Sequence, residues 1–220
     1  PGGGNLYNVN MYSNNKVSQG GGNNTVNGEI NTVNNSPWST ISQNSFFGKY
    51  TLNTSVSPID ISLQNSGLSN LVQQIKAQNL YSGDYKGSLN LQKLGKGLYV
   101  QGTFKPGWIE WNSDNSSLNA TTIIIAEGDI TFPSNNGMSM NSNNYVIYCS
   151  LNGNINFTYN GPFYGILYAP NGKINLSMGG STYYGSIVGQ TVTVGYGATT
   201  INYKNYLGTG SASGKIKLIE

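Results

Sequence analysis

The chain has 220 residues, of which only 9% are charged, and its 11 basic and 8 acidic residues give a formal net charge of +3. It contains no His, no Arg and one Cys, which excludes an imidazole base, a His-ligated metal and an internal disulfide, so we expect no cofactor. The scattered Lys residues form no basic stripe, which argues against nucleic-acid binding. No apolar run is long enough to predict membrane insertion. At this length one domain, residues 1–220, is expected.

Residues 1–45 are rich in Asn, Gly and Ser, which predicts irregular loops or a strand arm lying on the rest of the chain. The first residues show no signal peptide, so we expect a processed or excised domain. The composition favours an extracellular location. Trp38 is isolated in this region; it is a candidate binding residue, or it pins the arm to the rest of the domain.

Residues 66–80 form the helical candidate. Leu68, Leu71, Val72 and Ile75 follow the i, i+3, i+4, i+7 spacing of one helix face, and a Ser before them can cap the start. We expect this short helix to cap one end of the domain or to lie along its side.

Residues 85–218 alternate with a period of two and contain an internal repeat of strand, small-residue turn and strand. The repeated segments are IIIAEGDITF (123–132), VIYCSLNGNINF (146–157), GILYAPNGKINL (165–176), SIVGQTVTV (186–194) and, more weakly, GKIKL (214–218). Repeats of about twenty residues built from strands and turns indicate a solenoid. We therefore predict an all-β fold, a right-handed parallel β-helix with one short helix and long loops; an antiparallel sandwich is the alternative.

Stacking of the coils places equivalent residues in ladders. In the second strand of each repeat, we expect an inward column of Ile130, Ile155, Ile174 and Val192. Their neighbours would form outward ladders of amides and hydroxyls, among them Asp129, Asn154, Lys173 and Thr191. In the first strand, the expected inward column is Ile124, Ile147, Leu167 and Ile187, and Cys149 is expected to be a small buried residue.

The aromatic residues are the candidates for carbohydrate binding, because flat rings pack against the apolar faces of sugars. The alternation predicts that Tyr148, Tyr164, Tyr168 and Tyr184 point outward. Alternatively they stack on one another or lie under the first 80 residues, and a reset at Gly165 and Gly185 would exchange Tyr164 and Tyr184 with their neighbours. Trp108 and Trp111 either form an exposed platform, or one of them packs inward.

The repeats resemble a β-helical module of bacterial surface and pilus-associated proteins, and most closely the C-terminal domain of the tāpirins. The similarity covers roughly residues 85–205 and is carried by Gly97-Leu98-Tyr99-Val100, Ile123 to Ile130, Tyr164 to Gly172, Gly185 to Gly189 and Ile201-Asn202-Tyr203. Tāpirins are cellulose adhesins of plant-degrading bacteria, encoded beside type IV pilus genes. The resemblance implies a β-helix at the cell surface that binds cellulose.

The acidic residues give little support for catalysis. Polysaccharide lyases and hydrolases need paired carboxylates or a carboxylate-bound Ca²⁺. Glu127 and Asp129 are the closest pair, and we interpret them as residues of a solvated turn. Asp114, among Asn and Ser, offers a weak Ca²⁺ site.

We therefore expect a non-catalytic extracellular adhesin that binds insoluble polysaccharide, cellulose in particular, through exposed aromatic residues. Pilus or cell-surface proteins are possible additional partners. The alternative is a structural pilus-associated or cell-surface matrix module that binds protein; one sign of it would be a Tyr column buried under the first 80 residues. Ice binding by flat Thr and Asn ladders is a third reading, for which the ladders are too mixed.

Overall fold

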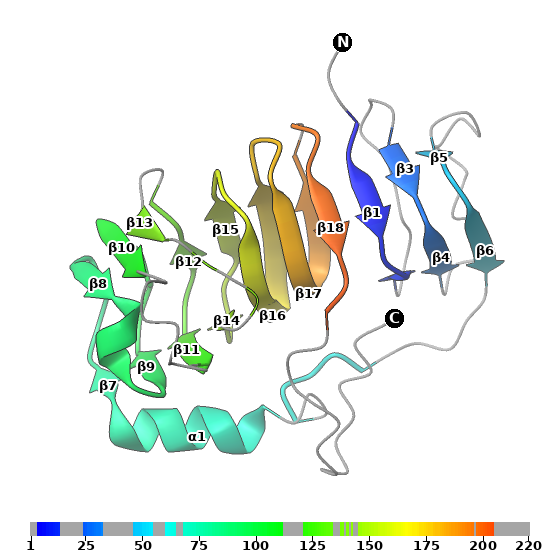
Figure 1. Ribbon diagram of the computed structural model, residues 1–220. Helices are drawn as coiled ribbons and strands as arrows, with labels where there is room; N and C mark the ends of the chain where they lie inside the picture. Colours follow the sequence, from blue (N-terminus) through cyan, green and yellow to red (C-terminus); the bar gives the residue numbers. More distant parts are fainter. Residues whose placement is uncertain are drawn as a thin grey trace.

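The computed structural model describes residues 4–13, 24–32, 46–54, 60–64, 68–111, 121–133, 137–138, 140, 142, 145–195 and 197–204. These residues form a parallel β-solenoid with a helix along one side (Figure 1). Every strand pair within them is parallel. The predicted parallel β-helix with one short helix is therefore confirmed.

The first face of the solenoid is a continuous ladder of strands from successive coils. In spatial order it contains β7 (Leu80–Tyr81), β9 (Gly97–Val100), β11 (Thr121–Ala126), β14 (Tyr145–Ser150), the N-terminal parts of β16 (Phe163–Ser177) and β17 (Thr182–Val194), β18 (Thr200–Asn202), β1 (Leu6–Asn8), β3 (Asn24–Val26) and β5 (Phe46–Phe47). The second face contains β12 (Ile130–Thr131), β15 (Ile155–Thr158) and the C-terminal halves of β16 and β17.

Two smaller sheets complete the coils. One contains β8 (Ser88–Asn90), β10 (Trp108–Trp111) and β13 (Gly137–Met138), and a 3₁₀ turn, η1 (Leu91–Leu94), follows β8. The other contains β2 (Met11–Ser13), β4 (Gly28–Thr32) and β6 (Tyr50–Thr54).

The N-terminal region contributes coils to the solenoid. β1 pairs with β18, so that Leu6 lies beside Thr200 and Asn8 beside Asn202, and β3 then stacks on β1. Of the two expectations for residues 1–45, strands lying on the rest of the chain describe residues 4–13 and 24–32 better than irregular loops, and these strands form further coils of the solenoid. The expected main coils of residues 85–218 are described as far as residue 204, and the weak repeat at 214–218 lies outside the described residues.

The helix α1 (Ser69–Gln78) lies within the range 66–80 predicted for it. It packs along the outer side of the first face and does not close an end of the solenoid (Figure 1). Leu68, Val72 and Ile75 pack there against outward residues of the first face, among them Ile123, Ile147 and Ile166. The apolar stripe read from the sequence is therefore the contact surface of the helix.

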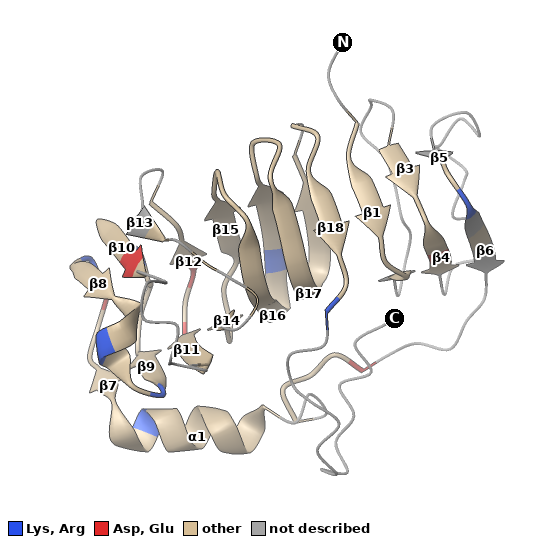
Figure 2. Ribbon diagram, in the orientation of Figure 1, with Lys and Arg blue, Asp and Glu red and all other residues tan. Residues whose placement is uncertain are grey.

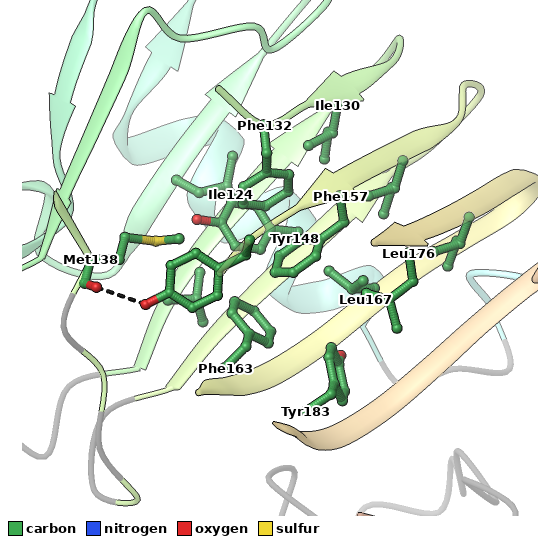
Figure 3. Close-up of a cluster of buried hydrophobic side chains, with 14 of the residues drawn as sticks. Ile124, Ile130, Phe132, Met138, Tyr148, Phe157, Phe163, Leu167, Leu176 and Tyr183 are labelled. Atoms are coloured by element: carbon green, nitrogen blue, oxygen red, sulfur yellow. Dashed lines mark hydrogen bonds between the residues drawn. The ribbon is translucent and has the colours of Figure 1, made fainter. Parts of the chain in front are cut away.

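A second apolar cluster fills the interior of the coils, where the inward residues of both faces meet (Figure 3). The predicted inward column of Ile130, Ile155, Ile174 and Val192 is confirmed by the strand register. Val192 nevertheless remains 42% exposed, because β18 pairs with the N-terminal part of β17 and leaves this part uncovered.

The predicted first-strand column is wrong at one position. Tyr148, and not Ile147, stands beside Ile124 and Leu167. The coil from Ile124 to Tyr148 is one residue longer than the alignment of the repeats predicts. A shift of one residue turns every side chain of a strand to the other face. Ile147 and Cys149 consequently face the helix α1.

Candidate functional site

Trp108 is the exposed aromatic residue of the predicted Trp platform. Along β10, Trp108 and Glu110 point outward and Ile109 and Trp111 point inward, and Trp108 is 40% exposed. Trp111 is fully buried, which contradicts the exposed platform of two Trp residues and confirms the alternative that one of them packs inward. Positions three apart on a strand lie on opposite faces. Trp108 and Trp111 therefore cannot form a shared platform, and of the two only the ring of Trp108 is exposed.

Tyr148 points into the interior of the solenoid, which corrects the prediction that it faces outward (Figure 3). Its ring meets that of Phe132 edge to face with centroids 4.5 Å apart. Its hydroxyl is buried and has no hydrogen-bond partner, and this burial raises its pKa far above the usual value. Tyr148 is a core residue and cannot contact a ligand.

Tyr168 points outward as the alternation predicts, but it is covered. Its ring belongs to the apolar cluster beneath α1, and its hydroxyl donates a hydrogen bond to the carbonyl oxygen of Ile61 over 2.7 Å. The alternative expectation, a Tyr residue lying under the first 80 residues, describes this position. Tyr168 is therefore removed from the exposed site.

Tyr164 and Tyr184 point outward on adjacent coils and are partly exposed. Their rings stack with centroids 4.7 Å apart and planes inclined by 7°. Phe163 and Tyr183 face the interior, so Gly165 and Gly185 do not reset the alternation. Desolvation raises the pKa of Tyr164, and the neighbouring Tyr184 raises it further. Because the two rings stack face to face, they continue an outward ladder of side chains from coil to coil. They do not lie side by side in one flat surface.

An Asn column continues this ladder across the junction between β18 and the N-terminal coils. The register places Tyr184 beside Asn202 and Asn202 beside Asn8. Asn8 donates to Asn202 Oδ1 over 2.8 Å, and Asn27 donates to Asn8 Oδ1 over 2.9 Å. Asn8 and Asn27 are not among the residues predicted from the alternation. Their 19-residue spacing, shared by Asn5 and Asn24, is the signal that would have revealed these coils.

The second face carries the predicted outward ladders of amides and hydroxyls. Asp129 Oδ1 accepts a hydrogen bond from the backbone N–H of Asn154, and Asn154 Oδ1 accepts one from the N–H of Lys173. In the next column, Asn175 Nδ2 donates to Asn156 Oδ1 over 2.8 Å. A shallow hollow of about 240 Å³ lies along this second column. The face thus offers a regular array of fixed donors and acceptors.

The carboxylates expected to form a solvated turn are occupied by structural hydrogen bonds. Glu127 Oε1 accepts a hydrogen bond from the hydroxyl of Tyr99 over 2.7 Å and lies 3.3 Å from Lys76 Nζ on α1. The hydrogen bond from Tyr99 lowers the pKa of Glu127 most, desolvation opposes it by a smaller amount, and the hydrogen bond and charge of Lys76 lower the pKa further. Asp129 is bound to Asn154. Both carboxylates of the pair are therefore held in structural contacts.

The remaining candidates do not gather with these residues. Trp38 and Asp114 lie outside the described residues. Cys149 is buried, and desolvation raises the pKa of its thiol to about 12, as suits a small core residue. Among the described residues no group of three or more His, Cys, Asp or Glu could hold a metal ion.

Charged residues are few and scattered among the elements of the described part of the chain (Figure 2). Lys173 of β16 lies on the second face beside Thr191 in the strand register, and its backbone N–H bonds to Asn154 Oδ1. No helix of the described part of the chain has the length and apolar character needed to cross a membrane. The surface of the described residues therefore offers hydrogen-bonding groups and the exposed indole ring of Trp108, with few charges.

Comparison with known proteins gives one match. The family model "Domain of unknown function (DUF7305)" matches residues 98–209, about half of the chain. No curated protein and no solved structure matches. The matched residues begin in β9 and cover the coils up to and beyond β18.

Proposed function

The chain belongs to the DUF7305 family, and we propose that it is a non-catalytic extracellular adhesin that binds insoluble polysaccharide, with cellulose as its ligand. The observation that carries this proposal is the regular, nearly uncharged array of Asn, Thr and Tyr side chains on the outer faces of the solenoid. Polysaccharides present hydroxyl groups at a fixed repeat, and a fixed array of donors and acceptors binds them without loss of side-chain freedom.

The spacing of the coils supports an extended β-linked chain as the ligand. Adjacent coils are ~4.8 Å apart, so equivalent side chains recur every ~10 Å at alternate coils. This distance is close to the length of the disaccharide unit of cellulose. A ladder of hydrogen-bonding side chains can therefore meet hydroxyls of every second sugar.

Trp108 supplies the aromatic component. A flat ring packs on the apolar face of a sugar and orders few rotatable bonds when it does so. Tyr164 and Tyr184 contribute to the outward ladder, as does the Asn column of Asn202, Asn8 and Asn27. The mechanism is therefore hydrogen bonding from fixed ladders, with ring stacking at Trp108.

Retention on microcrystalline cellulose tests this function. We expect the wild-type protein to be retained at both low and high salt, because little charge takes part. Trp108→Ala should weaken binding by about tenfold, since an aromatic contact with its buried area contributes on the order of 1–2 kcal/mol.

The matched control is Tyr81→Ala, which removes another exposed aromatic residue at 41% exposure, from β7. This variant should bind as the wild type does. A wild-type protein that is washed off cellulose would refute the proposed function, whatever the variants do.

One observation favours a second function, a structural pilus-associated or cell-surface matrix module that binds protein. Tyr168 lies under residues 60–64 and α1, so part of the aromatic column stabilises the fold and is closed to ligands. This function predicts no retention on cellulose by a protein whose circular dichroism shows an intact β fold. It also predicts chemical cross-linking to a surface or pilus protein on intact cells.

A further inference from the structure

Among the described residues, the coil that contains β18 has a strand on the first face and none opposite it. In the coils on either side the first-face strand is followed by a second strand: β17 turns from its N-terminal into its C-terminal half, β1 leads to β2, and β3 leads to β4. β18 lies between β17 and β1 (Figure 1). The missing strand therefore falls in the middle of the stack of coils, between β17 and β2.

This gap leaves two strand edges open. Residues 191–194 of β17 pair with β16 on one side, and β2 pairs with β4 on one side. No described strand pairs with either of them on the other side. The first face runs without a break from β17 through β18 to β1, while β2, β4 and β6 form a separate sheet. One strand in the gap would join the two parts of the opposite face.

The apolar interior is uncovered at the gap. Val192 belongs to an inward column whose other three members are fully buried, yet it is 42% exposed. Val194 and Met11 also pack on the interior cluster and are only partly buried. An open strand edge beside exposed apolar side chains is a site at which a further strand adds. The strand that fits here carries apolar side chains at alternate positions.

Residues 214–218, which lie outside the described residues, have such a sequence. Gly-Lys-Ile-Lys-Leu repeats four of the five residues of Gly-Lys-Ile-Asn-Leu at 172–176. That earlier segment belongs to β16 and pairs with residues 191–194 on the edge of β17 opposite the gap. Because stacked parallel strands place equivalent residues side by side, a segment that fits one edge of β17 suits the other edge as well.

The chain after β18 is long enough to reach the gap. In the preceding coil the chain passes from Tyr184 on the first face to Thr191 on the second in seven residues. Asn202 lies beside Tyr184, and Lys215 follows Asn202 by thirteen residues. The surplus is rich in Gly and Ser, the composition of turns. The connection therefore imposes no strain on the pairing.

We propose that residues 214–218 of the same chain occupy this gap as the second strand of the β18 coil, parallel to β17 and β2 and between them. Ile216 lies beside Val192 and covers it, and Lys217 points outward beside Thr193. The short tether gives this segment a higher local concentration at the gap than a strand of another molecule has. The assignment concerns the construction of the solenoid and does not depend on the ligand.

Disulfide formation in the full chain tests the placement. Thr193→Cys combined with Lys217→Cys puts two cysteines side by side on adjacent strands, within the Cα separation that a disulfide needs. Mild oxidation should link them within one molecule, and mass spectrometry of the digested monomer measures the linked peptides. Asn175→Cys combined with Lys217→Cys is the matched control. Asn175 lies in the same outward column with β17 in between, at ~10 Å from the tail, and should not be linked.

The remaining outcomes overturn the proposal. A linked dimer would assign the gap to the tail of a second copy. Equal linkage in the control pair, or no linkage in a variant with the circular dichroism of the wild type, would show that the tail does not lie beside β17.

A second measurement needs no cysteine. Ile216→Asn puts an amide into the apolar interior beside Val192 and should lower the Tm by roughly 4–8 °C. Lys217→Asn places the same amide on the outward side and should change the Tm by less than about 2 °C. An unchanged Tm in Ile216→Asn, or equal losses in both variants, would also overturn the proposal.

Discussion

Among the described residues of the solenoid interior, Tyr148 is the aromatic residue whose polar atom has no hydrogen-bond partner. The hydroxyl of Tyr148 is fully buried and unpaired, while that of Tyr159 donates a 2.7 Å hydrogen bond to the carbonyl of Met138. The ring of Tyr148 packs between Phe132 and Phe163. Its stabilising contribution is therefore that of the ring, and its hydroxyl opposes folding because it loses its hydration.

Tyr148→Phe should raise the free energy of unfolding by about 1 kcal/mol, since it removes a desolvated hydroxyl and retains the ring. The matched change Tyr159→Phe should lower it by a similar amount, because the hydrogen bond to the Met138 carbonyl is lost. Urea unfolding measures both. A destabilised Tyr148→Phe would mean that its hydroxyl has a partner, such as a buried water.

At the scale of the elements, α1 is held to the first face by an apolar stripe and by one polar cluster. Lys76 Nζ lies 3.3 Å from Glu127 Oε1 and 4.6 Å from the centre of the Tyr99 ring, while the Tyr99 hydroxyl donates to Glu127. These residues come from the helix, from β9 and from the turn after β11. Glu127 therefore joins three elements, and its role is structural.

The lowered pKa of Glu127 makes this contact sensitive to acid. A carboxylate with a lower pKa in the folded state stabilises the fold above its unfolded pKa, and this contribution is lost as the pH falls through the folded value. The unperturbed value is 4.5. We therefore expect Glu127→Gln to have a lower Tm than the wild type at pH 7, with the difference shrinking as the pH falls below about 4.5.

Melting curves of both proteins from pH 7 to pH 3 measure this difference. Glu110→Gln is the matched control, because Glu110 is exposed on β10 and its removal should leave the pH dependence unchanged. A constant difference in Tm between wild type and Glu127→Gln across this range would show that the contact does not depend on the charge.

At the scale of the whole molecule, the first strand of the chain, β1, lies in the middle of the stack of coils and not at one end of it. The coil of β1 stacks on β18, near the other end of the sequence, and β3 and β5 continue outward from there. The chain then returns to the far end, where α1 leads into β7 (Figure 1). The junction is closed by short strands, by the Asn column and by Asn5, which bonds to Thr199 and Gly195.

A disulfide across this junction tests the topology. Asn8→Cys combined with Asn202→Cys places two cysteines at paired positions 194 residues apart, within the Cα separation that a disulfide needs. Oxidation should close the loop, speed migration on a non-reducing gel and raise stability by up to about 5 kcal/mol. Cys149 should not interfere, because its burial suppresses the thiolate.

Asn27→Cys combined with Asn202→Cys is the control, since β1 lies between these positions. It should not form an intramolecular bond under the same oxidation. Bridging of this control pair, or failure of the first pair to bridge in a folded protein, would contradict the stacking order of the coils.

The sequence alone determined the repeat, the parallel solenoid, the helix stripe and the inward column of Ile130, Ile155, Ile174 and Val192. These follow from local periodicity, which each strand expresses by itself. It also predicted the outward direction of Tyr164, Tyr168 and Tyr184. It missed the N-terminal coils, because Asn8 and Asn27 stack on Asn202 through contacts that join distant parts of the chain.

Tertiary structure decided which of the outward-pointing side chains are exposed to solvent. Tyr164 and Tyr168 have the same parity on one strand, yet α1 and residues 60–64 cover Tyr168 and leave Tyr164 partly exposed. The orientation of the Tyr148 side chain was decided by one extra residue in its coil, which turned the side chain from the outer face to the core. Periodicity fixes the direction of a side chain within its strand. Coil length and the packing of other segments fix whether that direction leads to solvent.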